Sequence, residues 1–332
     1  MTQPLSALEG SALRPDEIDI RVGKLLDRFE RRQFFLRLGT TQPGGPNGRV
    51  GAQAISPAAQ IGKIGANLTD LGGDAALVGE AVFTTGMTGY EEVLTDPSFT
   101  GQIVAMTAPQ IGNTGVNGED AESVSGAPAA AALVVRDASP MTSSWRARDT
   151  LPGFLAARGA VAVTGVDTRR LVRHLRERGA MNCAIGTGNI DELVDRARSA
   201  PAMEGLDLVA RVTPATAYDF AEPLDEAFRP RGFGGAAGAS GPHVVAIDLG
   251  AKRNILRCLV SSGCRVTVVP ATASAHDVLE LGPDGIFVSS GPGDPAAVGY
   301  AIATIRDLLG KRPLFGVCLG HQLLALALGA RA

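Results

Sequence analysis

The second half of the chain alternates short apolar runs with segments of helical spacing, and this alternation constrains the fold more than any other feature. The runs are nearly continuous in β-branched and apolar residues, as expected for strands buried on both faces of a sheet. They cover residues 243–248, 265–270, 285–290 and 313–318. This order predicts a doubly wound α/β domain with a parallel sheet. Ligands of such sheets bind beyond the carboxyl ends of the strands, so we expect the chemistry after Asp248, Ser290 and Val317.

The rest of the chain divides into regions of different character. A length of 332 residues suggests about two domains. Residues 76–227 contain short β-like runs, turns and helical segments, and they predict a mixed α+β N-terminal domain. Residues 228–242 are rich in Gly, Ala and Pro and predict a linker to the α/β domain at 243–332. Residues 1–75 show little periodicity and are predicted to be irregular, apart from a partly helical basic segment at 24–39.

Composition and charge exclude several classes of protein. Lys and Arg number 31 against 34 Asp and Glu, and a net charge of −3 argues against a chain that coats nucleic acid or an anionic membrane. The longest uncharged apolar run, at 124–135, is too short for a membrane span, and the N-terminus lacks the pattern of a secretory signal. The four cysteines have no tight spacing and are predicted to be reduced thiols. We therefore expect a cytoplasmic protein that binds neither nucleic acid nor a membrane.

A G-x-C-x-G motif at 316–320 joins the last predicted strand to the helix that follows. Glycine on both sides allows the sharp turn of a nucleophile elbow, from which the central Cys318 side chain projects clear of the sheet. The N-terminus of the helix favours the thiolate, which is the nucleophilic form of cysteine. Cys318 is therefore the candidate nucleophile, in preference to a buried structural cysteine. A zinc site on Cys318 and His321 is disfavoured because no second ligand pair accompanies them, so no metal site is predicted.

A second turn rich in glycine and proline, SSGPGDP at 289–295, follows another predicted strand and precedes a helix. Gly291 and Gly293 permit close approach of the backbone, and such a turn presents amide N–H groups to a carboxylate or an oxyanion. A purely structural turn has the same composition. The position of this turn at the sheet edge expected to hold Cys318 favours the functional interpretation.

These motifs together resemble a known family. The α/β domain resembles the class I glutamine amidotransferase domain at residues 247–260, 289–295 and 316–329. The upstream domain is similar to the small, glutamine-hydrolysing chain of carbamoyl-phosphate synthase at residues 83–104, 109–117 and 166–182. The resemblance extends from about Val78 to Ala332.

The resemblance implies a mechanism and a set of site residues. Cys318 would attack the side-chain amide of glutamine and form a thioester while ammonia departs. The amides of Leu319 and Gly293 would hold the oxyanion. The residues implied to bind glutamine are Ser98, Gly291, Gly293, Leu319 and Gln322.

The resemblance also implies a partner. A large subunit would combine the ammonia with bicarbonate and ATP to make carbamoyl phosphate, for arginine and pyrimidine biosynthesis. We expect ATP and Mg²⁺ on that subunit and no cofactor in this chain, which has neither a Walker A motif nor a dinucleotide-binding fingerprint. The Arg-rich segment 167–179 predicts a helix whose basic face is either solvated or docked on an acidic partner surface.

The sequence departs from the family pattern at both ends. The family completes its cysteine with a His and a Glu from an H-P-E-like segment, which is absent between Cys318 and Ala332, so we expect a chain cut short within its α/β domain. The histidines outside the helix after Cys318 are not expected to replace this base: His174, His243 and His276. Residues 50–75 lack the strand and hairpin with which family members begin. Two alternatives stay open: a catalytically silent subunit that only docks on the large chain, and another class I amidotransferase or cysteine hydrolase of the same fold.

Overall fold

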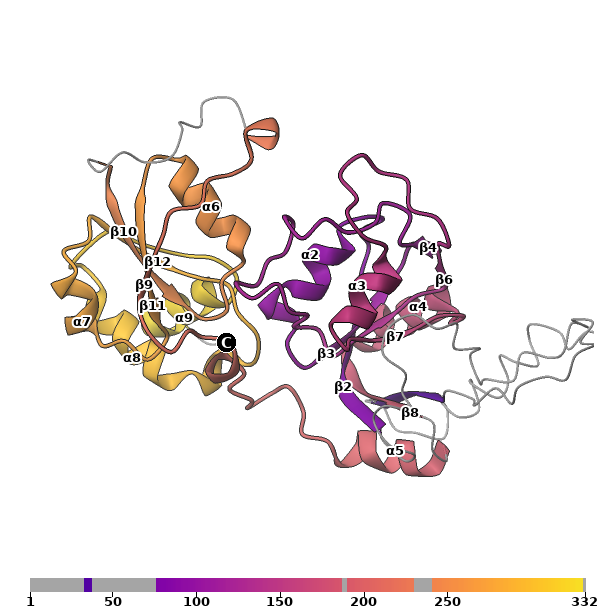
Figure 1. The fold of residues 1–332 in the computed structure, drawn as a ribbon. Coiled ribbons are helices and arrows are strands. Elements are labelled where there is room, and N and C mark those ends of the chain that lie inside the picture. Colours follow the sequence, from indigo (N-terminus) through magenta and orange to yellow (C-terminus); the bar gives the residue numbers. More distant parts are fainter. Residues whose placement is uncertain (1–32, 38–75, 187–189, 230–240, 331–332) are drawn as a thin grey trace, which may run out of the picture.

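The computed structural model describes residues 33–37, 76–186, 190–229 and 241–330. These residues form two large sheets with helices packed on both faces of each, and the two units lie side by side (Figure 1). Most of the predicted irregular segment and most of the predicted linker lie outside the described residues.

Within the described residues, the N-terminal sheet has six strands in the order β1-β8-β2-β3-β5-β7. These strands are β1 (Gln33–Arg37), β2 (Ala76–Thr84), β3 (Gln102–Met106), β5 (Ala132–Val134), β7 (Val161–Val163) and β8 (Met181–Gly186). All neighbouring pairs are parallel except β2 with β8. A short separate ladder pairs β4 (Gln110–Ile111) with β6 (Asp137–Ala138). The N-terminal domain is therefore mixed in strand direction.

Four helices accompany this sheet in the described residues. They are α2 (Tyr90–Thr95), α3 (Leu151–Ala157), α4 (Thr168–Arg178) and α5 (Ile190–Ser199). Helix α4 buries Leu171 and Leu175 against one face, while α2 and α3 pack on the other face and α5 packs beside β8. The Asp167 side chain caps α4 by accepting the Arg170 amide at 3.1 Å, and the helix ends before Gly179, as its sequence predicts.

The prediction for the segment at 24–39 fails at residues 33–37, the part of it that the structure describes. The segment at 24–39 was expected to be partly helical, but its residues Gln33–Arg37 form β1, which pairs in parallel with Asn182–Gly186 of β8. Without β1, the edge of β8 that faces away from β2 would have unpaired backbone groups. Pairing with such an edge overrides a weak local preference for helix.

The C-terminal sheet has the strand order β13-β12-β10-β11-β9 within the described residues. Its strands are β9 (Tyr218–Phe220), β10 (His243–Asp248), β11 (Arg265–Pro270), β12 (Gly285–Val288) and β13 (Leu314–Gly316). Only β9 runs antiparallel to its neighbour, and it belongs to this sheet although its residues lie within 76–227, the range predicted for the N-terminal domain. Strands β10 and β11 have the predicted bounds. Strands β12 and β13 end two residues early, because the residues that follow them turn into the candidate site.

Helices cover both faces of this sheet as the predicted doubly wound fold requires. They are α6 (Arg253–Ser261), α7 (Ala275–Glu280), α8 (Gly299–Leu308) and α9 (Leu319–Ala327). Helix α6 packs on one face, and α7, α8 and α9 pack on the other. The predicted α/β fold class is thus confirmed. No helix in the described part of the chain is both long enough and apolar enough to cross a bilayer.

Candidate active site

The elbow at 316–320 links β13 to α9 and strains its central residue. Cys318 has φ 54° and ψ −116°, and it is the one non-glycine with positive φ among the described residues. Such a backbone costs on the order of 1–3 kcal/mol and persists where its surroundings enforce it. A Cβ on Gly316 would lie 2.6 Å from the Gly320 backbone, and one on Gly320 would lie 2.3 Å from the Val288 carbonyl oxygen. Both glycines are therefore required, and the turn has the shape that its sequence predicts.

Cys318 differs from the other three cysteines in its exposure. All four are free thiols, but Cys318 is exposed, Cys183 is fully buried, and Cys258 and Cys264 are partly buried. Burial raises the pKa of Cys183 to about 12 and also raises the pKa of Cys258 and Cys264. Burial therefore disfavours the reactive thiolate of these three, and its exposure makes Cys318 the cysteine best placed to react.

The turn at 289–295, called here the GPG turn, lies directly beside the elbow. The Gly320 amide donates to the Ser289 carbonyl oxygen at 3.0 Å. A Cβ on Gly291 would lie 2.1 Å from the Leu249 carbonyl oxygen and 2.9 Å from Leu319 Cδ2. Glycine at 291 therefore lets the GPG turn, the end of β10 and the start of α9 meet at one point.

The first turn of α9 carries two further predicted residues. Leu319 is the first helical residue, and the amide at that position has no partner within the helix, so it is available to an oxyanion. Gln322 is exposed, and its amide donates to the Cys318 carbonyl oxygen at 3.1 Å. The roles of Leu319 and Gln322 stay predictions.

Gly293 packs against Leu206 and Leu208, in the segment that connects the N-terminal domain to the C-terminal sheet. It has φ 89°, and a Cβ there would lie 2.7 Å from the Leu206 carbonyl oxygen. The neighbouring Asp294 donates its amide to the same oxygen at 3.1 Å, and its Oδ2 accepts the Gly205 amide at 2.7 Å. The connection between the domains thus packs on the GPG turn, and the oxyanion role of Gly293 stays a prediction.

Ser98 comes from a short turn of the N-terminal domain, residues 96–99, called here the Ser98 turn. Asp96 caps it, because its Oδ1 accepts the Ser98 amide at 2.8 Å. The other oxygen, Oδ2, lies 3.2 Å from Lys252 Nζ in the C-terminal domain. Asp96 is buried, so this ion pair is shielded from bulk water on its acidic side.

Gly250 joins the Ser98 turn to the GPG turn. It has φ 115°, and a Cβ there would lie 3.2 Å from Pro97 Cβ and 3.0 Å from Pro292 Cδ. The structure therefore brings the predicted glutamine-binding turns of both domains to the carboxyl edge of the C-terminal sheet, although their roles stay predictions.

Our sequence reasoning missed polar side chains that tie this edge together. Asp248 Oδ1 accepts the Gly250 and Ala251 amides at 2.7 Å each, and burial raises the pKa of Asp248. Ser289 Oγ accepts the Leu249 amide at 2.8 Å. A signal was available, because Asp248 and Ser289 each follow an apolar run, and polar groups buried at strand ends need partners.

The base that activates a cysteine nucleophile is most often a histidine. The four histidines lie on α4, at the start of β10, on α7 and in the first turn of α9: His174, His243, His276 and His321. None of them is hydrogen-bonded to Cys318 in the described part of the chain. The same part contains no group of three or more His, Cys, Asp or Glu side chains suited to a metal ion.

A cavity of about 640 Å³ lies between the domains next to this edge. Its wall includes Pro97, Asp248 and Gly250, together with the loop at 123–129. Cys318 does not line it. The cavity therefore flanks the candidate site instead of containing the nucleophile.

Comparison with known proteins gives the family. The family model for the carbamoyl-phosphate synthase small chain, CPSase domain, matches residues 62–185, and the model for glutamine amidotransferase class-I matches residues 245–332. The carbamoyl phosphate synthase small chain of Thioalkalivibrio sulfidiphilus is 52% identical over 268 residues, which make up 79% of this chain and 69% of that protein. The chain belongs to the carbamoyl phosphate synthase small chain family.

Other relatives agree with this assignment. The carbamoyl phosphate synthase small chains of Syntrophotalea carbinolica and Pseudomonas aeruginosa are 51% and 49% identical, over 78% and 79% of this chain and 68% and 70% of their own lengths. The predicted family is confirmed, and the alternative of a different class I amidotransferase is set aside. The match to the small-chain model begins at residue 62, upstream of Val78, where the resemblance seen in the sequence begins.

Proposed function

We propose that this chain is the glutamine-hydrolysing subunit of a carbamoyl phosphate synthase, with Cys318 as its nucleophile. The observation that carries the proposal is the strained, exposed Cys318 at the N-terminus of α9, beside the GPG turn. A strained backbone persists at functional sites because it holds a side chain where the chemistry needs it.

The first chemical step uses the residues at this edge. The Cys318 thiolate attacks the side-chain amide carbon of glutamine, a C–S bond forms, and the carbonyl oxygen becomes an oxyanion. The amides of Leu319 and Gly293 donate to that oxyanion. The C–N bond then breaks, the nitrogen takes a proton and leaves as ammonia, and a thioester remains on Cys318. Water hydrolyses the thioester to glutamate and restores the thiol.

These chemical steps also need proton transfer, and no histidine of the described residues is hydrogen-bonded to Cys318. A general base or acid contributes typically 10²–10⁴-fold to such a step. The second candidate function is that the chain docks on a large subunit without hydrolysing glutamine. The two candidates differ in what Cys318 does, so an experiment on Cys318 separates them.

The fate of the ammonia points to the partner. Free ammonia is protonated in water at neutral pH and loses its nucleophilicity, so we propose direct delivery to a large subunit in a heterodimer. That subunit would hold ATP and Mg²⁺, join ammonia to bicarbonate and supply carbamoyl phosphate for arginine and pyrimidine synthesis, while this chain would need no cofactor. Free thiols at all four cysteines support a cytoplasmic location.

The test measures carbamoyl phosphate synthesis by the chain together with its large subunit, with glutamine or ammonia as the nitrogen source. Cys318→Ser should lower the glutamine-dependent rate by a factor on the order of 10⁴ or more and leave the ammonia-dependent rate unchanged. A wild-type complex that uses ammonia but not glutamine would instead identify a silent docking subunit.

A second measurement tests the nucleophile without a general base. A glutamine analogue with a chloromethyl ketone in place of the side-chain amide alkylates a thiolate directly, because chloride leaves as the C–S bond forms. Mass spectrometry of the 332-residue chain should find the adduct on Cys318 and not on Cys183, Cys258 or Cys264. Modification elsewhere, or none, would contradict a glutamine site at the elbow.

A further inference from the structure

Helix α6 has an unusual N-terminal cap, because the cap comes from the other domain. Its own N-cap residue, Lys252, makes no side-chain cap hydrogen bond. The first two helical amides instead donate to Glu122 of the N-terminal domain: Arg253 N to the carbonyl oxygen at 2.9 Å, and Asn254 N to Oε2 at 2.8 Å. A carboxylate at this position also interacts favourably with the helix dipole.

Glu122 is tied in turn to the segment that carries Ser98. Its amide donates to Thr95 Oγ1 at 2.8 Å, and the Thr95 hydroxyl donates to the Glu91 carbonyl oxygen at 2.8 Å. Thr95 is the last residue of α2, and the Ser98 turn follows it directly. A continuous line of hydrogen bonds therefore runs from α2 through Glu122 to the start of α6.

The start of α6 is itself fixed to the glutamine edge. Only four residues separate Arg253 from Asp248, the last residue of β10, and in that interval Gly250 packs against both the Ser98 turn and the GPG turn. Shifting α6 relative to Thr95 would therefore move the two turns relative to each other.

The contact of Glu122 with the start of α6 is buried. Glu122 is 5% exposed, and burial raises its pKa although the Asn254 amide and the Lys252 ammonium oppose the shift. Lys252 Nζ lies 3.9 Å from Glu122 Oε1 and closer to Asp96. Removing one partner from such a buried set leaves the other groups without compensation.

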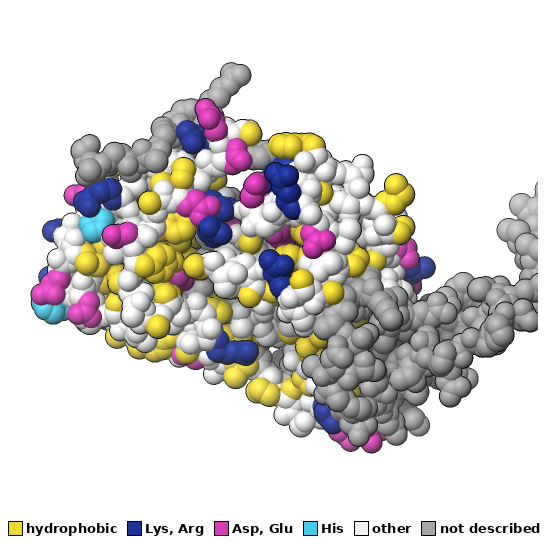
Figure 2. Space-filling model, viewed as in Figure 1, with side chains coloured by type: hydrophobic (Ala, Val, Ile, Leu, Met, Phe, Trp, Pro, Cys, Tyr) yellow, Lys and Arg dark blue, Asp and Glu magenta, His cyan; other side chains and the backbone are white. Residues whose placement is uncertain are grey.

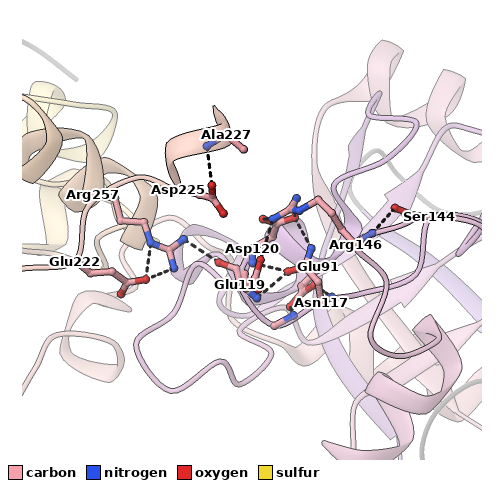
Figure 3. Close-up of polar contacts among 11 residues, drawn as sticks. Glu91, Asn117, Glu119, Asp120, Ser144, Arg146, Glu222, Asp225, Ala227 and Arg257 are labelled. Carbon is pink, nitrogen blue, oxygen red and sulfur yellow. Dashed lines mark hydrogen bonds and ion pairs between the residues drawn. The ribbon is translucent and has the colours of Figure 1, made fainter. Parts of the chain in front are cut away.

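Surface charges around this contact are more exposed. Figure 2 shows acidic and basic side chains interleaved across the face between the two units. In Figure 3, Arg257 of α6 donates to the Glu119 carbonyl oxygen at 2.9 Å and also binds Glu222. Because Arg257 uses the backbone of Glu119, the Glu119 side chain, 59% exposed, can be removed without breaking that cross-domain bond.

We propose that Glu122 is a positioning residue for glutamine: by capping α6 from the N-terminal domain it holds the Ser98 turn in register with the GPG turn and the elbow. This inference rests on the proposed function. Glu122 touches neither the nucleophile nor the edge where glutamine would bind, so its effect is on how tightly glutamine is held and not on the reactivity of the Cys318 thiol.

The experiment compares two reagents on Cys318 in the full chain. The chloromethyl ketone analogue of glutamine reports both binding, as its half-saturating concentration, and the maximal alkylation rate. Iodoacetamide reports thiol reactivity without recognition of glutamine. Glu122→Ala should raise the half-saturating concentration of the analogue at least about tenfold, the scale of one lost hydrogen bond to a charged group, with little change in the maximal rate. The iodoacetamide rate should stay within about twofold of wild type, because the elbow is untouched.

Three variants accompany Glu122→Ala. Glu122→Gln keeps an oxygen for the Asn254 amide and should recover most of the affinity. Thr95→Val removes the hydroxyl that anchors Glu122 with little change in shape, and it should weaken binding of the analogue in the same direction even where Glu122→Ala does not fold. Glu119→Ala, the matched surface control, should match wild type with both reagents.

The outcomes separate this inference from the proposed function. Unchanged binding of the analogue to folded Glu122→Ala, or equal losses with both reagents, would overturn the positioning role. If Glu122→Ala does not fold, unchanged binding to Thr95→Val would do the same. A wild-type chain that reacts with iodoacetamide at Cys318 but not with the analogue would overturn the proposed glutamine site itself.

Discussion

The elbow and the Ser98 turn meet at one sheet edge, but different forces hold them there. The elbow is fixed by steric exclusion close to Cys318, since its two glycines leave no room for a side chain against β12 and α9. The Ser98 turn is fixed by contacts from the other domain, among them the ion pair of Asp96 with Lys252. Steric exclusion in a packed core is severe, whereas a single polar contact is worth about 1 kcal/mol. Changes in the elbow should therefore cost the most.

The largest effect is expected for Gly320→Ala. The new Cβ would lie 2.3 Å from the Val288 carbonyl oxygen and 2.7 Å from that of Ser289, both in backbone that cannot move aside cheaply. The free energy of unfolding should fall by about 3 kcal/mol, measured by urea denaturation, and alkylation of Cys318 by the glutamine analogue should be lost.

Gly299→Ala provides the matched control for that substitution. Gly299 begins α8, and a Cβ there would meet no atom within 4 Å. Alanine is the better helix former, so this variant should be as stable as wild type or more stable by up to about 1 kcal/mol. Equal losses in Gly299→Ala and Gly320→Ala would refute steric exclusion as the origin of the elbow.

A smaller effect is expected where the two turns meet. Gly250→Ala places a side chain at φ 115°, within 3.2 Å of Pro97 and 3.0 Å of Pro292. We expect a loss of about 2 kcal/mol in unfolding free energy from the backbone strain. Binding of the glutamine analogue should weaken, while the iodoacetamide rate at Cys318 stays close to wild type. If analogue binding and the iodoacetamide rate both fell, the contact at Gly250 and the elbow would not be independent.

The same contrast explains what the sequence could predict. Apolar runs fixed the bounds of β10 and β11, and the G-x-C-x-G motif indicated the elbow, because each depends on neighbours in the chain. Nothing in residues 96–99 themselves distinguishes the Ser98 turn from any other turn, and only the family resemblance drew attention to Ser98. The Glu122 cap of α6 joins residues 132 positions apart, and no local pattern records such a contact.

Strand β1 shows that a long-range contact can also override a local sequence pattern. Its residues lie in a basic segment whose local pattern favours helix, yet the backbone pairs with β8, about 150 positions along the chain. Roles were harder to predict than positions. Asp248 and Ser289 each follow an apolar run, but the amides that they bind could be identified only when the strand ends were placed in three dimensions.

A third prediction concerns the cap of the Ser98 turn. Asp96→Ala removes the oxygen that accepts the Ser98 amide and the partner of Lys252. Loss of a cap costs about 1 kcal/mol, so thermal stability should fall modestly. Binding of the glutamine analogue should weaken more than stability does, because Ser98 loses its orientation. Asp96→Asn keeps an oxygen for the amide and should lie between Asp96→Ala and wild type in both measurements. An Asp96→Asn variant as weak as Asp96→Ala would assign the effect to the charge and not to the cap.

The smallest effect is expected for Glu222→Gln, which removes a charge that binds α6 from the segment directly after β9, a strand of the C-terminal sheet. Arg257 donates to the Glu222 carboxylate (Figure 3), and so does Arg253. Burial alone would raise the pKa of Glu222, but these hydrogen bonds outweigh it, so the pKa lies below its usual value. A carboxyl whose pKa falls on folding stabilises the protein above its unfolded pKa, here about 4.5, and this stability is lost as the pH falls through the folded pKa.

Glu222→Gln should therefore lower the unfolding free energy at pH 7 by at most about 1 kcal/mol, since the carboxylate is 37% exposed, and the difference from wild type should shrink below pH 4.5. Binding of the glutamine analogue should not change, because Glu222 itself bonds to α6 and Arg257 can keep its own bond to the Glu119 carbonyl oxygen. A loss of binding comparable to that of Asp96→Ala would show that Glu222 also helps to hold α6 in register. The Ser98 turn would then depend on contacts within the C-terminal unit as well as on contacts between the domains.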